Sequence, residues 1–183
     1  MKKFLVNSLM VFALAFVTLL GSSVVKVEAA VTKSDDLIII NKHYNKLIYY
    51  HNGYVEMIEP VATGKSWEKT PVGHFKIVNK IKNRPYYTGH IPGGDPRNPL
   101  GKRWLGLDAD GTKGDTYAIH GNANESSIGK YVSQRCVRMH NASIEKLFDK
   151  VKVGTPVAIT NSPKSFQELT KIYGYKFKGY NTK

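Results

Sequence analysis

The sequence predicts a mainly β domain with one or two short helices. Three observations point to this class: short runs of β-branched and aromatic residues recur along the chain, the connections between them are rich in Gly, Pro, Asn and Asp, and a single segment has convincing helical periodicity. These strands and that helix all fall within residues 30–160, where no linker divides them. The length allows one domain with a substantial core.

The predicted strands begin with a meander at residues 37–40, 47–50 and 54–58. The last two runs flank Asn52 and Gly53, and an Asn-Gly pair favours a tight hairpin because that turn needs positive φ at both positions. Residues 84–102 are rich in proline and glycine, so we expect a long loop over a site there. Further short strands are predicted at 75–78, 104–107, 117–119 and 157–160.

The helix is predicted directly after the only cysteine. Asn141 is placed to cap its first turn, and Gly154 followed by Pro156 ends it. Its apolar side chains recur at helical spacing and predict a stripe that faces the core: Ile144, Leu147, Phe148 and Val151. Residues 161–183 form a basic tail, for which we expect a weak helix or a surface arm.

The first 29 residues predict export. Lys2 and Lys3 precede an apolar stretch at 4–20, and small residues precede a cleavage point after Ala29, as in a signal peptide. The apolar stretch is almost long enough to span a membrane, so an uncleaved anchor is the alternative, and only then would the protein contact a membrane. In either case we expect a secreted or cell-wall, extracytoplasmic location.

The mature region is strongly basic, because removal of three lysines and one glutamate with residues 1–29 changes the formal net charge only from +13 to +11. Outside the cell this charge favours anionic cell-wall polymers as partners, with simple solubility as the alternative. No nucleic-acid-binding motif is present, so we expect no nucleic acid partner. The spacing of histidines and the single cysteine fit no metal site, and we expect no cofactor and a monomer.

Cys136 is the only cysteine and lies between Arg135 and Arg138, sixteen positions after His120. A lone cysteine is commonly a small buried hydrophobe, and that interpretation stays open. Cationic neighbours favour a nucleophile instead, because positive charge stabilises the thiolate. His120 is the best-placed base: it ends the strand at 117–119, and Gly121 lets the backbone turn away. No carboxylate is obviously placed to orient His120, which leaves that role to a backbone carbonyl.

Several motifs together resemble the catalytic domain of the L,D-transpeptidases, the YkuD family. The family pattern of His-Gly, about fifteen residues and Ser-x-Gly-Cys-[Ile/Val]-Arg is matched by His120-Gly121 and by Ser133 to Arg138. The segments at 70–77, 98–106 and 154–159 are similar to other strands and loops of that family. The resemblance covers residues 37–160 and implies an L,D-transpeptidase-like β-sandwich or barrel.

The resemblance implies acyl transfer between peptidoglycan stem peptides. Cys136 would attack the carbonyl before a terminal D-alanine, and His120 would act as general base and acid. The backbone N–H groups of Arg135 and Cys136 would form the oxyanion hole, in which one donor contributes about 3 kcal/mol to lowering the barrier. Gly121 and Ser133 would shape the site, and Arg138 would hold the loop or bind a substrate carboxylate.

One departure concerns Arg135, since the family usually has glycine before the catalytic cysteine. If that backbone needs a positive φ, a side chain there adds strain of about 1 kcal/mol. Alternatively, the charge of Arg135 lowers the thiol pKa or binds the donor peptide.

Other functions stay open at this point. A sortase-type enzyme also uses Cys, His and Arg, but with a histidine far upstream and an arginine well downstream of the cysteine. The remaining alternatives are an L,D-carboxypeptidase acting on the same stems, and a weakly active or non-catalytic cell-wall-binding protein.

Overall fold

The computed structural model describes residues 35–66 and 69–182. The predicted signal peptide, residues 1–29, lies outside the described residues. Within them, ten strands and two α-helices follow one another, so the predicted mainly β class with short helices is confirmed. No helix in this part of the chain is long and apolar enough to cross a membrane.

The predicted meander is formed by β1 (Asp36–Asn41), β2 (Lys46–His51) and β3 (Tyr54–Gly64). The three strands are antiparallel, with Ile39 opposite Ile48 and Ile48 opposite Ile58. Asn52 and Gly53 have φ values of 50° and 97°. The Asn-Gly pair therefore makes the tight hairpin that the sequence predicts.

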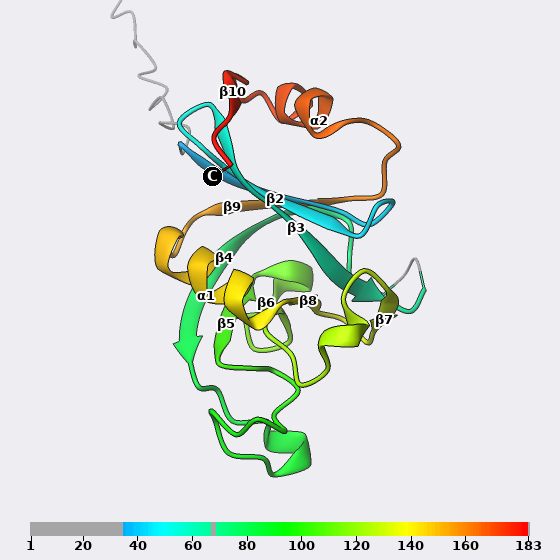
Figure 1. The fold of residues 1–183 in the computed structure, drawn as a ribbon, viewed down its shortest axis with the longest axis vertical. Helices are drawn as coiled ribbons and strands as arrows, with labels where there is room; N and C mark the ends of the chain where they lie inside the picture. Colours follow the sequence, from blue (N-terminus) through cyan, green and yellow to red (C-terminus); the bar gives the residue numbers. More distant parts are fainter. Residues whose placement is uncertain (1–34, 67–68, 183) are drawn as a thin grey trace, which may run out of the picture. The chain divides into compact units, whose positions relative to one another are not determined.

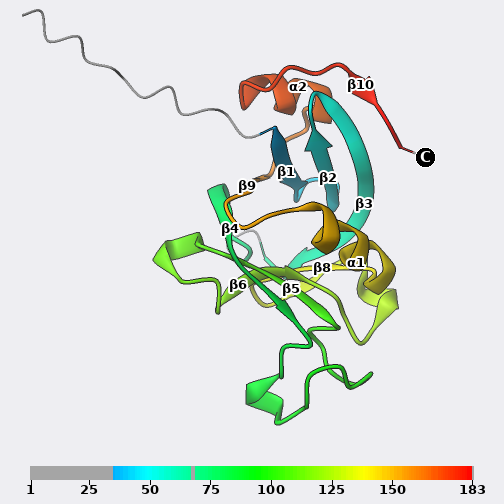
Figure 2. The same ribbon diagram turned by 90° about the vertical axis from the view of Figure 1, so that its left-hand side faces the viewer.

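Two long strands close the sheet into a barrel. The first part of β3 pairs with β2, while Val61 and Ala62 pair with β8 (Val137–Met139). In the same way β4 (Gly73–Lys82) pairs first with β9 (Pro156–Thr160) and then with β5 (Arg103–Leu107). With β6 (Tyr117–His120) between β5 and β8, the order β3-β2-β1-β9-β4-β5-β6-β8 returns to β3. Figure 2 shows the curved β3 running from β2 towards β8.

Alternate residues of β1 enter two different cores. Ile38 and Ile40 pack into the main core together with the apolar side of α1 (Asn141–Lys150). Leu37 and Ile39 face the other way, into a second core that includes Leu169 of α2 (Phe166–Ile172). Figure 1 shows α1 and α2 on opposite sides of the β1–β2–β9 part of the sheet. Burial of both faces explains why residues 37–40 are uniformly apolar.

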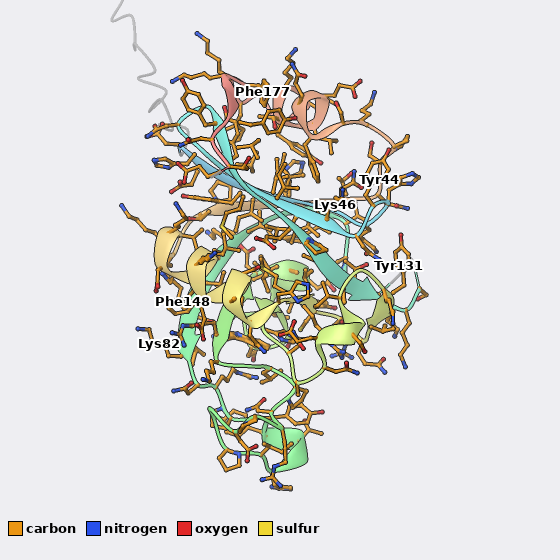
Figure 3. The ribbon with its side chains drawn as sticks, in the orientation of Figure 1. Tyr44, Lys46, Lys82, Tyr131, Phe148 and Phe177 are labelled. Atoms are coloured by element: carbon orange, nitrogen blue, oxygen red, sulfur yellow. The ribbon has the colours of Figure 1, made fainter. Side chains whose placement is uncertain are left out.

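The basic tail forms part of this second core. A capping box of Ser165 and Glu168 starts α2, and Leu169 is buried. The chain then returns along the sheet, where β10 (Gly179–Tyr180) pairs with β3. The aromatic side chains that pack partly buried here are Phe166, Tyr173, Tyr175 and Phe177, the last of which is labelled in Figure 3. The helix expected in the tail is present, and the described tail packs on the sheet instead of forming a surface arm.

The helix predicted after the cysteine is confirmed as α1, with Ile144, Leu147 and Phe148 buried. The predicted cap is wrong, because Asn141 is already the first helical residue and His140 before it makes no side-chain capping bond. The carboxylate of Glu125 instead accepts a hydrogen bond from the Asn141 N–H at 3.2 Å. A distant acidic residue therefore satisfies the helix N-terminus, which spacing alone does not reveal.

Candidate active site

Cys136 lies in the turn between β7 (Tyr131–Ser133) and β8, and its carbonyl oxygen fixes that turn. The oxygen accepts hydrogen bonds from Ser133 Oγ at 2.6 Å and from Thr70 Oγ1 at 3.4 Å. Thr70 has a φ of 61°, unusual for a β-branched residue. The buried Lys42 ammonium donates to the Thr70 carbonyl at 2.7 Å and helps to hold this conformation. The Cys136 turn is thus held by the hydroxyl groups of Ser133 and Thr70, and Lys42 holds Thr70.

Strand β3 holds both ends of this turn. Thr63 and Gly64 at its end pair with β7, and Val61 and Ala62 pair with β8. The hydroxyl of Tyr131, labelled in Figure 3, also donates to the Lys42 carbonyl at 2.7 Å. The turn is therefore tied to the barrel wall on both sides, which fixes the position of Cys136.

His120 ends β6 and is buried, with 3% of its surface exposed. In the sheet it lies between Trp104 of β5 and Arg138 of β8. The imidazole stacks on the Trp104 indole, with ring centroids 5.5 Å apart and an angle of 11° between planes. Its Nδ1 lies 2.7 Å from the Gly121 carbonyl oxygen. Because a carbonyl only accepts, Nδ1 carries the proton in the neutral ring and Nε2 keeps a lone pair.

Gly121 lies behind His120 and not among the residues that line the cavity. A Cβ at this position would lie 2.3 Å from Asn141 Oδ1 and 3.1 Å from the Gly101 Cα. Glycine is therefore required here by the close approach of neighbouring atoms. Its contribution to the site is the carbonyl that orients His120, which agrees with the expectation that a backbone carbonyl takes this role.

Cys136 and His120 line the same cavity, which has a volume of about 610 Å³. One wall comes from the predicted long loop between β4 and β5, with Tyr87 in its single turn of 3-10 helix. Ser133 at the end of β7 and Arg135 in the Cys136 turn also line the cavity, and β8 supplies Arg138. The remaining lining residues are Lys69, Arg84, Tyr86, Thr88, Pro99, Leu100, Trp104, Asp115, Thr116 and Gln134. The structure thus brings together the sequence-predicted residues except Gly121.

Burial lowers the pKa of His120 from its ordinary value of 6.5 to about 4. The guanidinium groups of Arg138 and Arg84 lower this pKa further, while the hydrogen bond to the Gly121 carbonyl opposes the shift. The imidazole is therefore neutral at pH 7, with Nε2 able to accept a proton.

This shift predicts acid-dependent stability. Between pH 6.5 and about 4 the unfolded chain binds a proton at His120 that the folded protein does not bind. Stability therefore falls as pH falls through this window, by about 3 kcal/mol in total. Urea unfolding of wild type and His120→Gln between pH 7 and 4 measures this difference. The matched variant His43→Gln, at an exposed histidine, should keep the wild-type slope; equal slopes for all three proteins would contradict the assignment.

Burial also determines the protonation state of the Cys136 thiol. It raises the pKa of Cys136 to about 11, although the Ala118 backbone N–H and three arginines, Arg138, Arg84 and Arg135, favour the thiolate. The arginines favour the thiolate, as expected, but desolvation of the thiolate outweighs them in the resting protein. The protonated Sγ donates to the Thr116 carbonyl at 3.5 Å. At rest the pair consists of a neutral thiol and a neutral imidazole.

Arg135 lies in the Cys136 turn without backbone strain. Its φ is not positive, in contrast to Thr70 close by in space. The backbone strain expected from having arginine where the family usually has glycine is therefore absent. Its N–H and that of Cys136 lie before β8, and neither donates a backbone hydrogen bond among the described residues.

The comparison with known proteins identifies the family. The YkuD model, the L,D-transpeptidase catalytic domain, matches residues 35–159. The chain belongs to this family. The putative L,D-transpeptidase YqjB of Bacillus subtilis is 46% identical over 135 residues, which cover 74% of this chain and 77% of that protein.

Other relatives match smaller shares of this chain. The putative L,D-transpeptidase YkuD of Bacillus subtilis is 40% identical over 108 residues, 59% of this chain and 56% of that protein. A solved catalytic domain of an Enterococcus faecium L,D-transpeptidase, described as acylated by ertapenem, matches with a TM-score of 0.53 at 23% identity, covering 69% of this chain and 97% of that one. The predicted L,D-transpeptidase fold is confirmed, and the protein is an enzyme of this class.

The absence of strain at Arg135 leads to a prediction. Arg135→Gly should give no faster acylation, because there is no positive φ to relieve. Loss of the charge should instead raise the thiol pKa and slow alkylation by iodoacetamide near pH 8 by roughly two- to fivefold, as expected for an exposed charge. Arg135→Lys keeps the charge and should react at the wild-type rate. Faster acylation in Arg135→Gly would restore the strain explanation.

Several residues of the site escaped sequence reasoning. Thr70 and Trp104 lie in segments that resemble the family, but their contacts with the Cys136 turn and with His120 depend on the closed barrel. Lys42 and Arg84 carry no motif signal at all. Only the folded chain shows that Lys42 holds Thr70 and that Arg84 lies near both Cys136 and His120.

Proposed function

We propose that this protein is an exported cysteine acyltransferase that forms peptidoglycan cross-links, with a thioester on Cys136 and release of a terminal D-alanine. The observation that carries this proposal is one cavity lined by both the single thiol and a buried, neutral imidazole whose Nδ1 is held by the Gly121 carbonyl. Membership of the L,D-transpeptidase family supports the substrate class.

The first half of the proposed reaction forms the acyl-enzyme. The resting pKa values of thiol and imidazole differ by about 7, so proton transfer before attack is strongly unfavourable. The thiol therefore turns from the Thr116 carbonyl and loses its proton to His120 Nε2 as the sulfur–carbon bond forms. The N–H groups of Arg135 and Cys136 stabilise the tetrahedral oxyanion. His120 then protonates the leaving amine, the carbon–nitrogen bond breaks, and D-alanine departs.

The second half transfers the acyl group to a side-chain amine of a neighbouring stem. The amine attacks the thioester carbon and loses a proton to His120. Collapse of the intermediate expels the Cys136 sulfur, which regains the proton from His120, and leaves a new amide. The enzyme returns to its neutral pair, and the reaction needs no cofactor.

We place this reaction in the cell wall. The signal peptide predicted at residues 1–29 would export the protein, and the basic surface would hold it on anionic wall polymers. We expect the protein to act as a monomer.

Incubation of the mature protein with a disaccharide-tetrapeptide tests the proposal, with mass spectrometry as the readout. We expect loss of D-alanine together with cross-linked dimer. Tripeptide without dimer would identify an L,D-carboxypeptidase, and an unchanged substrate would support a non-catalytic wall-binding protein. Cys136→Ala serves as the control for contaminating activity.

A further inference from the structure

We propose that Arg84 binds the terminal carboxylate of the donor stem peptide, and that this contact restricts the enzyme to stems that end at the residue to be released. The inference rests on the proposed function. It concerns a residue outside every motif that the sequence singles out, on the loop that forms one wall of the cavity.

The chemistry of the donor requires a cation close to His120. The leaving amine takes its proton from His120, and the carboxylate of the same D-alanine lies only two bonds beyond that nitrogen, within roughly 3 Å. The group that binds this carboxylate must therefore share the neighbourhood of the imidazole.

Arg84 meets this requirement through Trp104. Its guanidinium carbon lies 4.1 Å from the centre of the Trp104 ring, the same indole on which His120 stacks. The indole is buried and fixed, since its Nε1 donates to the Gly114 carbonyl at 2.8 Å. Arg84 and His120 are thus held by one aromatic side chain.

The backbone and head group of Arg84 are also held in place. The buried Asn98 side chain donates to the Arg84 carbonyl at 3.0 Å and to the Pro92 carbonyl at 3.1 Å, which ties the start of the loop to its middle. Nη2 of Arg84 donates to the Asp115 carbonyl at 3.2 Å. The planar guanidinium is therefore oriented before any ligand arrives, and its remaining N–H groups suit a carboxylate.

The cavity has an excess of positive charge that its own carboxylates do not neutralise. Four cationic residues line it, Lys69, Arg84, Arg135 and Arg138, against the single carboxylate of Asp115. Among the described residues no carboxylate lies within 4.0 Å of a nitrogen of the three arginines. The Asp115 carboxylate accepts a hydrogen bond from the Thr116 hydroxyl at 3.1 Å. An anionic ligand would complete this site.

Arg138 is the rival for this role, because it neighbours His120 in the sheet. Arg84 is favoured because aromatic stacking and a backbone carbonyl fix its guanidinium, as recognition of a planar carboxylate requires. The two assignments are distinguished by measuring turnover of an acid and an amide peptide in variants of each arginine.

The test compares a tetrapeptide that ends in D-alanine with one that ends in D-alaninamide, using mass spectrometry of the released group. Wild type should release D-alanine from the acid with a kcat/KM roughly tenfold to a hundredfold higher than that for the amide. Arg84→Gln should lose this preference because turnover of the acid falls, while turnover of the amide stays within about threefold. Arg84→Lys, which keeps the charge without the planar fork, should keep part of the preference.

The acid-to-amide ratio within one protein sample does not depend on how much of a variant is folded. Arg97→Gln is the matched control: it removes the same charge from the same loop, and Arg97 lies outside the cavity lining, paired with Asp95. It should keep the wild-type ratio. Equal turnover of acid and amide by wild type, or a preference that survives Arg84→Gln and disappears in Arg138→Gln, would overturn the inference while the proposed function stands. Release from neither peptide would overturn both.

Discussion

Cys136→Ala should abolish release of D-alanine and covalent labelling, with a loss of at least about a thousandfold. The sequence holds no second thiol. The nearest hydroxyl of the turn, Ser133 Oγ, already donates to the Cys136 carbonyl at 2.6 Å and cannot replace the sulfur. The assay is turnover of the disaccharide-tetrapeptide, followed by mass spectrometry.

Two controls separate chemistry from folding in this variant. Cys136 is half-buried at the edge of a small apolar cluster, so its truncation should change the free energy of unfolding by about 1 kcal/mol, which urea unfolding measures. Cys136→Ser keeps the shape and should retain little activity, because its hydroxyl ionises far less readily than a thiol. Full activity in Cys136→Ala would contradict the proposed mechanism.

His120→Gln should produce the second-largest loss, lowering the acylation rate by about a hundredfold to ten-thousandfold, the usual contribution of a general base. Glutamine has no titratable group in its side chain, so the loss reports removal of the base. Stopped-flow or quenched acylation by a carbapenem measures the rate.

The acylation rate should depend on pH differently in wild type and in His120→Gln. In wild type the rate should fall as pH drops through about 4, where His120 gains a proton, and should be nearly flat from there to the region of the thiol pKa at about 11. Without the base, the rate of His120→Gln should follow the thiolate alone and rise about tenfold per pH unit up to that region. A wild-type thiol that is already ionised at pH 6, seen as a flat alkylation rate from that pH upward, would contradict the neutral resting pair.

The strands with strong local signals could be predicted from the sequence, and those made by tertiary pairing could not. The Asn52-Gly53 hairpin and the apolar run of β1 were evident because turn chemistry and side-chain branching are local properties. Strands β7 and β8 have three residues each and exist because β3 pairs with both. For the tail the sequence predicts only a weak helix or a surface arm, because its basic residues obscure the four aromatic side chains and Leu169 that cover the second face of the sheet.

In the site, too, features with a local sequence signal could be predicted and features that depend on tertiary structure could not. The positions of Cys136 and His120 were predictable because a motif and a strand end carry them. The raised pKa of the thiol was not, because charge is visible in a sequence while burial is not, and here burial is the larger effect. Arg84 was missed because its position beside Trp104 follows from the path of the β4–β5 loop, which Asn98 fixes.

The central claim is that Cys136 carries the acyl group, and intact-protein mass spectrometry after incubation with ertapenem tests it most directly. A thiol set to attack an amide beside a carboxylate should also open a β-lactam ring. We predict one adduct per chain, mapped by peptide mass spectrometry to Cys136, formed in wild type and absent from Cys136→Ala. An adduct that persists in Cys136→Ala, or tetrapeptide turnover by wild type with no adduct at all, would contradict the account.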